Sequence, residues 1–135
     1  MKGMEEQNFM TWMKTYRTVV LINLLVIFAQ FGLAGQMLGG RGSAVAIHGF
    51  TGVLLVLIAL VQAALSIGLK AKSIGPTWLV VANVGIIVAE VIEAVCGHFH
   101  NLAVHVPLAL AVFGGVMRQL FWAVRETSAA SELRV

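Results

Sequence analysis

The chain has 135 residues, of which 59% are hydrophobic and only 11% are charged, with a net charge of +3 and a single cysteine. A soluble domain of this size carries about 25% charged residues, so the composition excludes an ordinary soluble protein and favours a membrane protein. The lone Cys96 excludes an intramolecular disulfide framework. The positive net charge does not indicate nucleic acid, because the basic residues flank apolar segments, where they set membrane topology.

Four apolar segments are each long enough to cross a bilayer, which takes about 20 residues. The predicted spans are residues 18–38, 44–69, 77–95 and 103–124. Residues 1–17 form a polar lead, and residues 126–135 form a short polar tail that we expect to fray. Because the connections between spans are short, we predict that residues 1–135 form one all-α domain, an integral membrane up-down-up-down four-helix bundle.

Basic residues predict the orientation of this bundle. They precede the first span and lie between the second and third, whereas Arg41 alone lies on the opposite side. By the positive-inside rule both termini are cytoplasmic, and we expect the cytoplasmic membrane of a bacterium or archaeon. Trp12, Tyr16, Trp78 and Trp122 fall at the same predicted boundary, as an aromatic belt would. The first apolar run starts too late and is too long for a cleaved signal peptide.

The spans read as two repeated helix hairpins. Three pairs of positions agree between the hairpins: Gly40 with Gly97, His48 with His105, and Gly52 with Ala109. In a bundle built from this repeat, the second and fourth spans lie on a diagonal and run in the same direction. We therefore expect the two histidines at similar depth near the outer face, both facing the bundle centre.

His48 and His105 are the main candidate site residues, since an ionisable side chain within a membrane span is a functional-site hypothesis by default. Two imidazoles at matched positions predict one shared ligand, for which haem iron is favoured. The alternatives are another metal and a pair of interfacial histidines without a ligand. Gly52 and Ala109 each lie four residues after a histidine and hence on its face, where they leave room for a porphyrin edge. Thr51 is a candidate for a hydrogen bond that tunes ligand basicity.

Other polar side chains lie within the predicted spans. Five amides are expected to join helices by hydrogen bonds rather than to contact a ligand: Asn23, Gln30, Gln36, Gln62 and Asn83. Glu90 and Glu93 lie in the outer half of the third span, where a carboxyl group is costly. Glu93 shares a stripe of small residues with Gly85, Ala89 and Gly97, which predicts that it faces another helix, and at most one of the two glutamates should point straight inward. They are candidates for a proton relay, a base for quinol oxidation or a partner for an imidazole, and the alternative is a protonated carboxyl that joins helices.

A second, weaker group falls on the predicted outer loop. Cys96, His98 and His100 combine a His-x-His pair with a thiol, which can bind copper or zinc, although the spacing matches no specific zinc motif. Alternatively, His98 or His100 contacts a haem propionate or shares ligation with His105. Arg41, the sole outer cation, is a candidate partner for a propionate.

Several short motifs together resemble a known family. They are Gln-Phe-Gly-Leu-Ala-Gly at 30–35, Ile-His-Gly-Phe-Thr-Gly at 47–52, Val-His-Val-Pro-Leu-Ala at 104–109, and Phe113-Gly114. With this pattern the chain resembles one four-helix half of haem A synthase, and also small bacterial four-span proteins with the same outline. Each half of that enzyme is a four-helix bundle with paired histidines near the outer face. The resemblance therefore implies His48 and His105 as axial haem ligands.

The chain also departs from that enzyme. Its catalytic half carries a glutamate three residues before a ligand histidine, whereas Val45 and Leu102 stand at those places here. The outer-loop cysteine pair of many synthases is absent, since Cys96 stands alone. These departures argue against hydroxylation of haem and favour a stand-alone b-type haem protein.

We therefore expect a membrane cytochrome with one haem b, which transfers electrons from a quinol or an outer donor to a partner. Full ligation by two histidines leaves no open iron position, so electron transfer is favoured over catalysis. Two alternatives stay open, a homodimeric haem-modifying enzyme of the haem A synthase type and a haem-free assembly subunit. The expected partners are membrane lipid, a quinone, and either a second copy or a larger respiratory or redox complex, with no nucleic acid.

Overall fold

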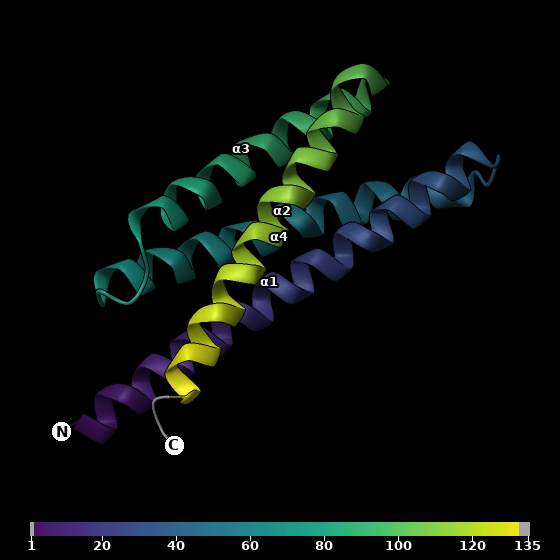
Figure 1. Cartoon of the computed structure of the whole chain (residues 1–135). Helices are drawn as coiled ribbons and strands as arrows, with labels where there is room; N and C mark the ends of the chain where they lie inside the picture. The colour runs from purple at the N-terminus through teal and green to yellow at the C-terminus, as the bar shows by residue number, and fades with distance from the viewer. Residues whose placement is uncertain (1, 133–135) are drawn as a thin grey trace.

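The computed structural model describes residues 2–132, which form four α-helices in succession. They are α1 (Lys2–Leu38), α2 (Ser43–Ala71), α3 (Thr77–His98) and α4 (Leu102–Glu132). Each helix contacts the next, and α4 closes the ring against α1 (Figure 1). The predicted all-α, up-down-up-down four-helix bundle is confirmed, with α2 and α4 on one diagonal and α1 and α3 on the other.

Within the described residues, four helical segments are long and apolar enough to cross a membrane. They are Glu6–Leu38, Ser43–Ala71, Thr77–His98 and Leu102–Ala130, between 22 and 33 residues long. Large apolar side chains such as Phe28, Phe50, Val81 and Leu110 are more than half exposed on the outside of the bundle. An apolar surface of this extent is unsuited to water, so the chain is a multi-pass membrane protein.

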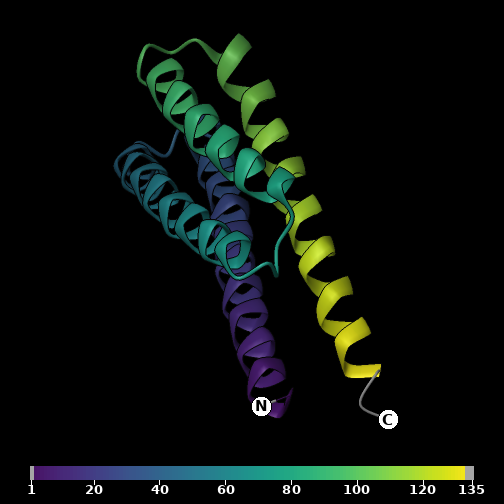
Figure 2. The same cartoon turned by 90° about the vertical axis from the view of Figure 1, so that its left-hand side faces the viewer.

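The bundle has two unlike ends. The turns at residues 39–42 and 99–101 lie at one end, which we call the hairpin end, and both termini lie at the other, the terminal end (Figures 1 and 2). In Figure 1 the tip formed by α1 and α2 separates from the tip formed by α3 and α4. At the opposite end, α1 and α4 extend past the turn that joins α2 to α3 (Figure 2).

Both chain ends are more ordered than the spans alone predict. The polar lead is part of α1, and α4 continues through the expected fraying tail as far as Glu132, while residues 133–135 lie outside the described part. The two extensions contact each other, since Arg17 Nη1 donates to Thr127 Oγ1 at 3.2 Å. Thr127 and Tyr16 are buried in this contact region, which explains why both segments stay helical beyond the apolar core.

The first three helices end in the same way. The residue after each helix that adopts a left-handed conformation is Gly40 (φ +83°), Ser73 (φ 58°) or His100 (φ 57°). The next N–H then donates to the carbonyl five residues back, at 3.0 Å for Arg41, 2.9 Å for Ile74 and 2.8 Å for Asn101. These are Schellman motifs, which satisfy carbonyls that a helix end leaves free.

This geometry corrects the predicted repeat at the turns. Gly40 corresponds in structure to His100, whereas Gly97 lies inside α3. The reason is that His105 lies three residues after the start of α4, and His48 five residues after the start of α2. The repeat therefore aligns the histidines but not the turns that precede them.

The buried core occupies the part of the bundle nearer the terminal end. Toward the hairpin end it stops at Ile27, Leu55, Glu90 and Val112, one from each helix. Beyond these levels, Ala44 is the one buried residue in the described chain. Packing is thus tight near the terminal end and loose where the hairpin tips separate.

Candidate functional site

The fold brings His48 of α2 and His105 of α4 together across the diagonal of the bundle. Their ring centroids are 6.1 Å apart, and the ring planes are inclined by 68°. Both residues are partly buried, on the hairpin side of the core. The histidines are thus neighbours at similar depth, as the repeat predicts, while the identity of any shared ligand stays a prediction.

His105 is held in place by α3. Its Nδ1 lies 2.9 Å from the main-chain oxygen of Glu93, and 3.8 Å from Glu93 Oε1. Because a carbonyl oxygen can only accept, Nδ1 is the donor in this contact and Nε2 is not engaged by it. A Cβ at Gly97 would lie 3.1 Å from the ring, so glycine there lets the imidazole pack directly on α3.

His48 is held through its backbone instead. Gln30 of α1 donates from Nε2 to the His48 carbonyl at 3.1 Å. The Thr51 hydroxyl lies 3.0 Å from Gln30 Oε1 and 2.8 Å from the carbonyl of Ile47. A Cβ at Gly52 would lie 3.2 Å from Gln30 Nε2, so Gly52 gives the Gln30 side chain room to cross between the helices.

These contacts revise the role expected for Thr51. Its hydroxyl bonds to Gln30 and to main-chain carbonyls rather than to the His48 ring, because a helical threonine readily bonds the carbonyl one turn back. The His48 Nδ1 is buried and has no hydrogen-bond partner within residues 2–132. Thr51 and Gly52 therefore fix α1 against α2 beside His48.

Two other predicted site residues lie further from the rings. Ala109 is half-buried one helical turn beyond His105, and Arg41 is exposed in the turn at residues 39–42.

The two glutamates differ in depth, and only Glu90 points straight inward, in agreement with the expectation that at most one of them does so. Glu90 is only 3% exposed and points straight inward, with neither carboxyl oxygen bonded within the described chain. Glu93 lies at the edge, with 20% of its side chain exposed. Glu93 faces α4, as predicted, with its carboxyl 3.8 Å from His105 Nδ1. Asn83 and Glu90 form the inner face of α3, whereas Gly85 of the predicted stripe of small residues is exposed. Their role as a proton relay stays a prediction.

The second predicted metal site is not assembled. Residues 2–132 contain no group of three or more His, Cys, Asp or Glu side chains placed to hold a metal ion. Because α3 continues through His98, Cys96 and His98 are two residues apart on a helix and lie on opposite sides of it. His98 packs edge-on against Phe99 with ring centroids 5.2 Å apart. The left-handed His100 then redirects the chain.

A buried hydrogen-bonded network, which the sequence did not reveal as a unit, lies nearer the terminal end. Tyr16 Oη donates to Gln119 Oε1 at 2.7 Å, and Asn83 Nδ2 donates to Tyr16 Oη at 3.1 Å. Gln62 Nε2 donates to Asn83 Oδ1 at 2.9 Å and also to Gln119 Oε1. Asn23 Nδ2 completes the set by donating to Gln62 Oε1 at 3.1 Å. We call these five residues the polar cluster, and each is at most 1% exposed.

The sequence repeat between the two helix hairpins includes two members of the polar cluster. Gln62 and Gln119 are separated by 57 residues, which is also the separation of His48 and His105. Each glutamine follows its histidine by 14 positions, or almost four helical turns of about 3.6 residues each. It therefore lies on the same face of the helix, roughly 21 Å further along. The two hairpins thus repeat a histidine and a glutamine, at two levels of one diagonal.

These observations define the class as a four-helix, multi-pass membrane protein with a histidine pair at one level and a polar cluster at another. Comparisons with protein-family models, with curated proteins and with solved structures find no match to the chain. The resemblance to haem A synthase therefore remains an expectation from short motifs.

Proposed function

We propose that the protein is a membrane b-type cytochrome that binds one haem b through His48 and His105 and serves in electron transfer. The observation that carries this proposal is the 6.1 Å separation of the two ring centroids. An imidazole nitrogen binds a transition metal at about 2.0 Å. Two imidazoles on opposite sides of one iron therefore have ring centres roughly 6 Å apart.

The surroundings of the two rings fit such a ligand. The Glu93 carbonyl orients His105 through Nδ1 and leaves Nε2 for a metal, which is the usual arrangement around metal-bound histidine. His48 contributes a buried ring nitrogen, Nδ1, that has no protein partner within the described chain. The loose packing beyond the core supports room for a flat group, since Ala44 is the one buried residue of the described chain past the level of Ile27, Leu55, Glu90 and Val112.

The chemistry of this site follows from its ligands. A haem iron with two axial imidazoles has no open coordination position and supplies one-electron transfer rather than oxygen activation. The residues of the chain hold and orient the group at one depth of the bundle. Electrons would thus pass between a quinol or an outer donor and a partner protein on the same side.

The orientation is also part of the proposal. Lys14, Arg17, Lys72 and Arg125 belong to the terminal end, whereas Arg41 lies at the hairpin end. The positive-inside rule then puts both termini in the cytoplasm. We infer a bacterial or archaeal cytoplasmic membrane, with the histidine pair near its outer face.

A reduced-minus-oxidised optical spectrum of detergent-purified protein from haem-replete cells tests the proposal. We expect sharp low-spin b-type bands, about one haem per chain, and no shift when carbon monoxide is added to the reduced form. A strong carbon monoxide shift would contradict ligation by two histidines. A colourless, folded protein would overturn the proposal and favour a haem-free helical subunit. Hydroxylated haem in the extract would favour a haem-modifying enzyme.

Gly97→Val should weaken haem binding although neither His48 nor His105 is substituted. The new side chain would meet the His105 ring and push it away from the Glu93 carbonyl. Loss of a partner that orients a metal-bound histidine costs roughly tenfold or more in affinity. Haem content per chain measures the effect, with Gly49→Val as a control because a Cβ there meets no atom within 4 Å. Equal haem content in both variants would contradict the role given to Gly97.

A further inference from the structure

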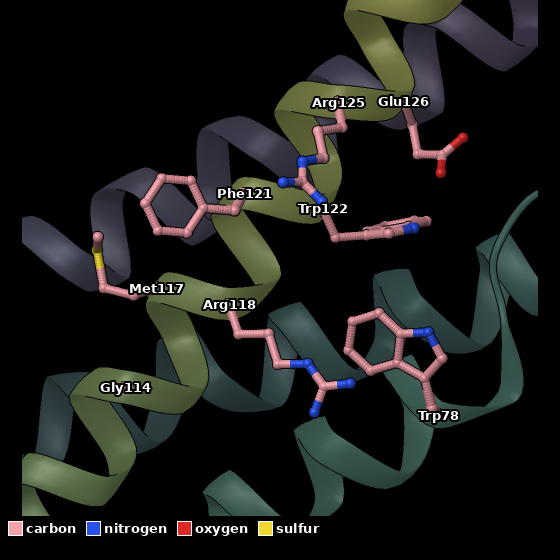
Figure 3. Close-up of a pocket in the computed structure, with 8 residues that line it drawn as sticks. All are labelled: Trp78, Gly114, Met117, Arg118, Phe121, Trp122, Arg125 and Glu126. Carbon is pink, nitrogen blue, oxygen red and sulfur yellow. The ribbon is translucent and has the colours of Figure 1, made fainter.

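A pocket of about 600 Å³ lies at the terminal end of the bundle, away from the histidine pair (Figure 3). Its α4 lining consists of seven residues: Gly114, Met117, Arg118, Phe121, Trp122, Arg125 and Glu126. Trp78, the second residue of α3, closes the opposite side. The pocket is therefore a site between α3 and α4 on the outer surface of the bundle.

The two arginines give the pocket its charge. The Arg118 guanidinium lies 4.6 Å from the centroid of a Trp78 ring, a cation–π contact. Neither Arg118 nor Arg125 forms a salt bridge with a carboxylate of the described chain. In Figure 3, Arg125 extends along α4 toward Arg118, whereas the Glu126 carboxylate points away from both. Two cations without anionic partners thus line one side of the pocket.

Apart from Glu126, the rest of the lining is apolar. Trp78 and Trp122 pack edge-to-face with ring centroids 6.0 Å apart, and paired indoles are typical of the membrane–water boundary. Phe121 is adjacent to Trp122 in sequence, Met117 lies about one turn further toward the bilayer beside Arg118, and Gly114 lies about one turn beyond Met117. A Cβ at Gly114 would meet no atom within 4 Å, so the deepest part of the lining is an open groove. The pocket therefore offers Arg125 at the boundary, Arg118 about two turns deeper among apolar side chains, and an open groove beyond it at Met117 and Gly114.

We propose that this pocket binds one anionic phospholipid, with the phosphate against Arg118 and Arg125 and an acyl chain along Phe121, Met117 and Gly114. Guanidinium groups pair well with phosphate oxygens, and a basic pocket between membrane helices suits a lipid headgroup. Free phosphate shares the headgroup chemistry but has no acyl chain, so the groove distinguishes the two sources.

Quenching of tryptophan fluorescence by brominated lipids tests this site. In a Trp12→Phe background the remaining indoles are Trp78 and Trp122, both in the pocket lining. Brominated phosphatidylglycerol is expected to quench more strongly than brominated phosphatidylcholine, with a binding preference of about fivefold for each arginine. Arg118→Gln with Arg125→Gln should bring this ratio close to one. Lys14→Gln, which removes an exposed charge at the same end, should leave it unchanged.

A second pair of variants tests the acyl groove. Gly114→Leu fills the groove without a clash and should lower quenching by brominated phosphatidylglycerol severalfold. Gly85→Leu is the matched control, because Gly85 is also exposed, also free of neighbours at its Cβ, and outside the pocket. The proposal would be overturned if the Trp12→Phe protein binds brominated phosphatidylglycerol and brominated phosphatidylcholine equally. It would also be overturned if the preference for phosphatidylglycerol persists in the double arginine variant. If inorganic phosphate alone removes the preference for brominated phosphatidylglycerol, the lipid proposal is overturned in favour of a site for a free anion.

Discussion

Replacing His105 by alanine is expected to remove nearly all haem from the protein, whereas His48→Ala should leave a weakly bound, high-spin haem. The difference follows from how each ring is held. The Glu93 carbonyl and the close approach at Gly97 fix the His105 ring in one orientation, and a pre-oriented ligand binds more tightly. His48 is held instead through its main-chain carbonyl, to which Gln30 donates. His105 alone can therefore retain the iron better than His48 alone.

Optical spectra of the two variants check this order. In His48→Ala the open position should bind carbon monoxide after reduction, and added imidazole should restore the low-spin bands. His98→Ala is the control, since His98 is exposed at the hairpin end and packs on Phe99. If both His48→Ala and His105→Ala keep the wild-type spectrum, the iron ligands lie elsewhere and the site assignment is wrong. Loss of the bands in His98→Ala alone would point to the hairpin tip instead.

Most of the fold was predictable because it follows from hydropathy alone. Long runs of uncharged residues predict membrane spans, and short connections predict that neighbouring helices are antiparallel. The helix ends were less predictable, since Ser73 and His100 adopt left-handed conformations in which glycine is the usual residue. The extensions of α1 and α4 also escaped prediction, because they depend on contacts between distant segments such as Arg17 with Thr127.

The site was predictable only where the repeat marked it. His48 and His105 follow from matched positions, but the burial of Glu90 depends on the rotation of α3 about its axis. That rotation is set by packing against α2 and α4, which a stripe of small residues does not encode. The second metal site failed for a related reason, because residues 96–98 continue the helix instead of forming a flexible loop.

The interhelical hydrogen bonds of Asn23, Gln62 and Asn83 were predicted and are confirmed, but Tyr16 and Gln119, and the assembly of all five into one cluster, were not predicted. Gln119 follows the charged Arg118, which predicts a position near the membrane–water boundary. Tyr16 is predicted to belong to an aromatic belt at the same boundary. In the structure both are fully buried and bonded to each other. Because the polar cluster draws on all four helices, it fixes their register at one level. The histidine pair on the same diagonal depends on that register, so the cluster acts as a support for the site.

Gln62→Leu should therefore be among the most destabilising substitutions in the chain. Gln62 bonds to Asn23, Asn83 and Gln119, one residue on each of the other three helices. Its loss leaves buried polar groups unpaired, which costs roughly 2–4 kcal/mol in the free energy of unfolding. Gln119→Leu should cost less, because the Gln119 Nε2 has no partner within the described chain and its removal relieves a buried donor.

Denaturation of the purified variants in mixed micelles measures these free energies. Gln36→Leu is the matched control, since Gln36 is exposed near the hairpin end and its loss should change stability by less than about 0.5 kcal/mol. The double variant Gln62→Leu, Gln119→Leu should be less destabilised than the sum of the single variants, because the two side chains share a hydrogen bond. Equal stabilities of Gln62→Leu and Gln36→Leu would show that the polar cluster does not fix the register of the helices. In that case the histidine pair must owe its position to the contacts of Gln30 and Glu93 alone.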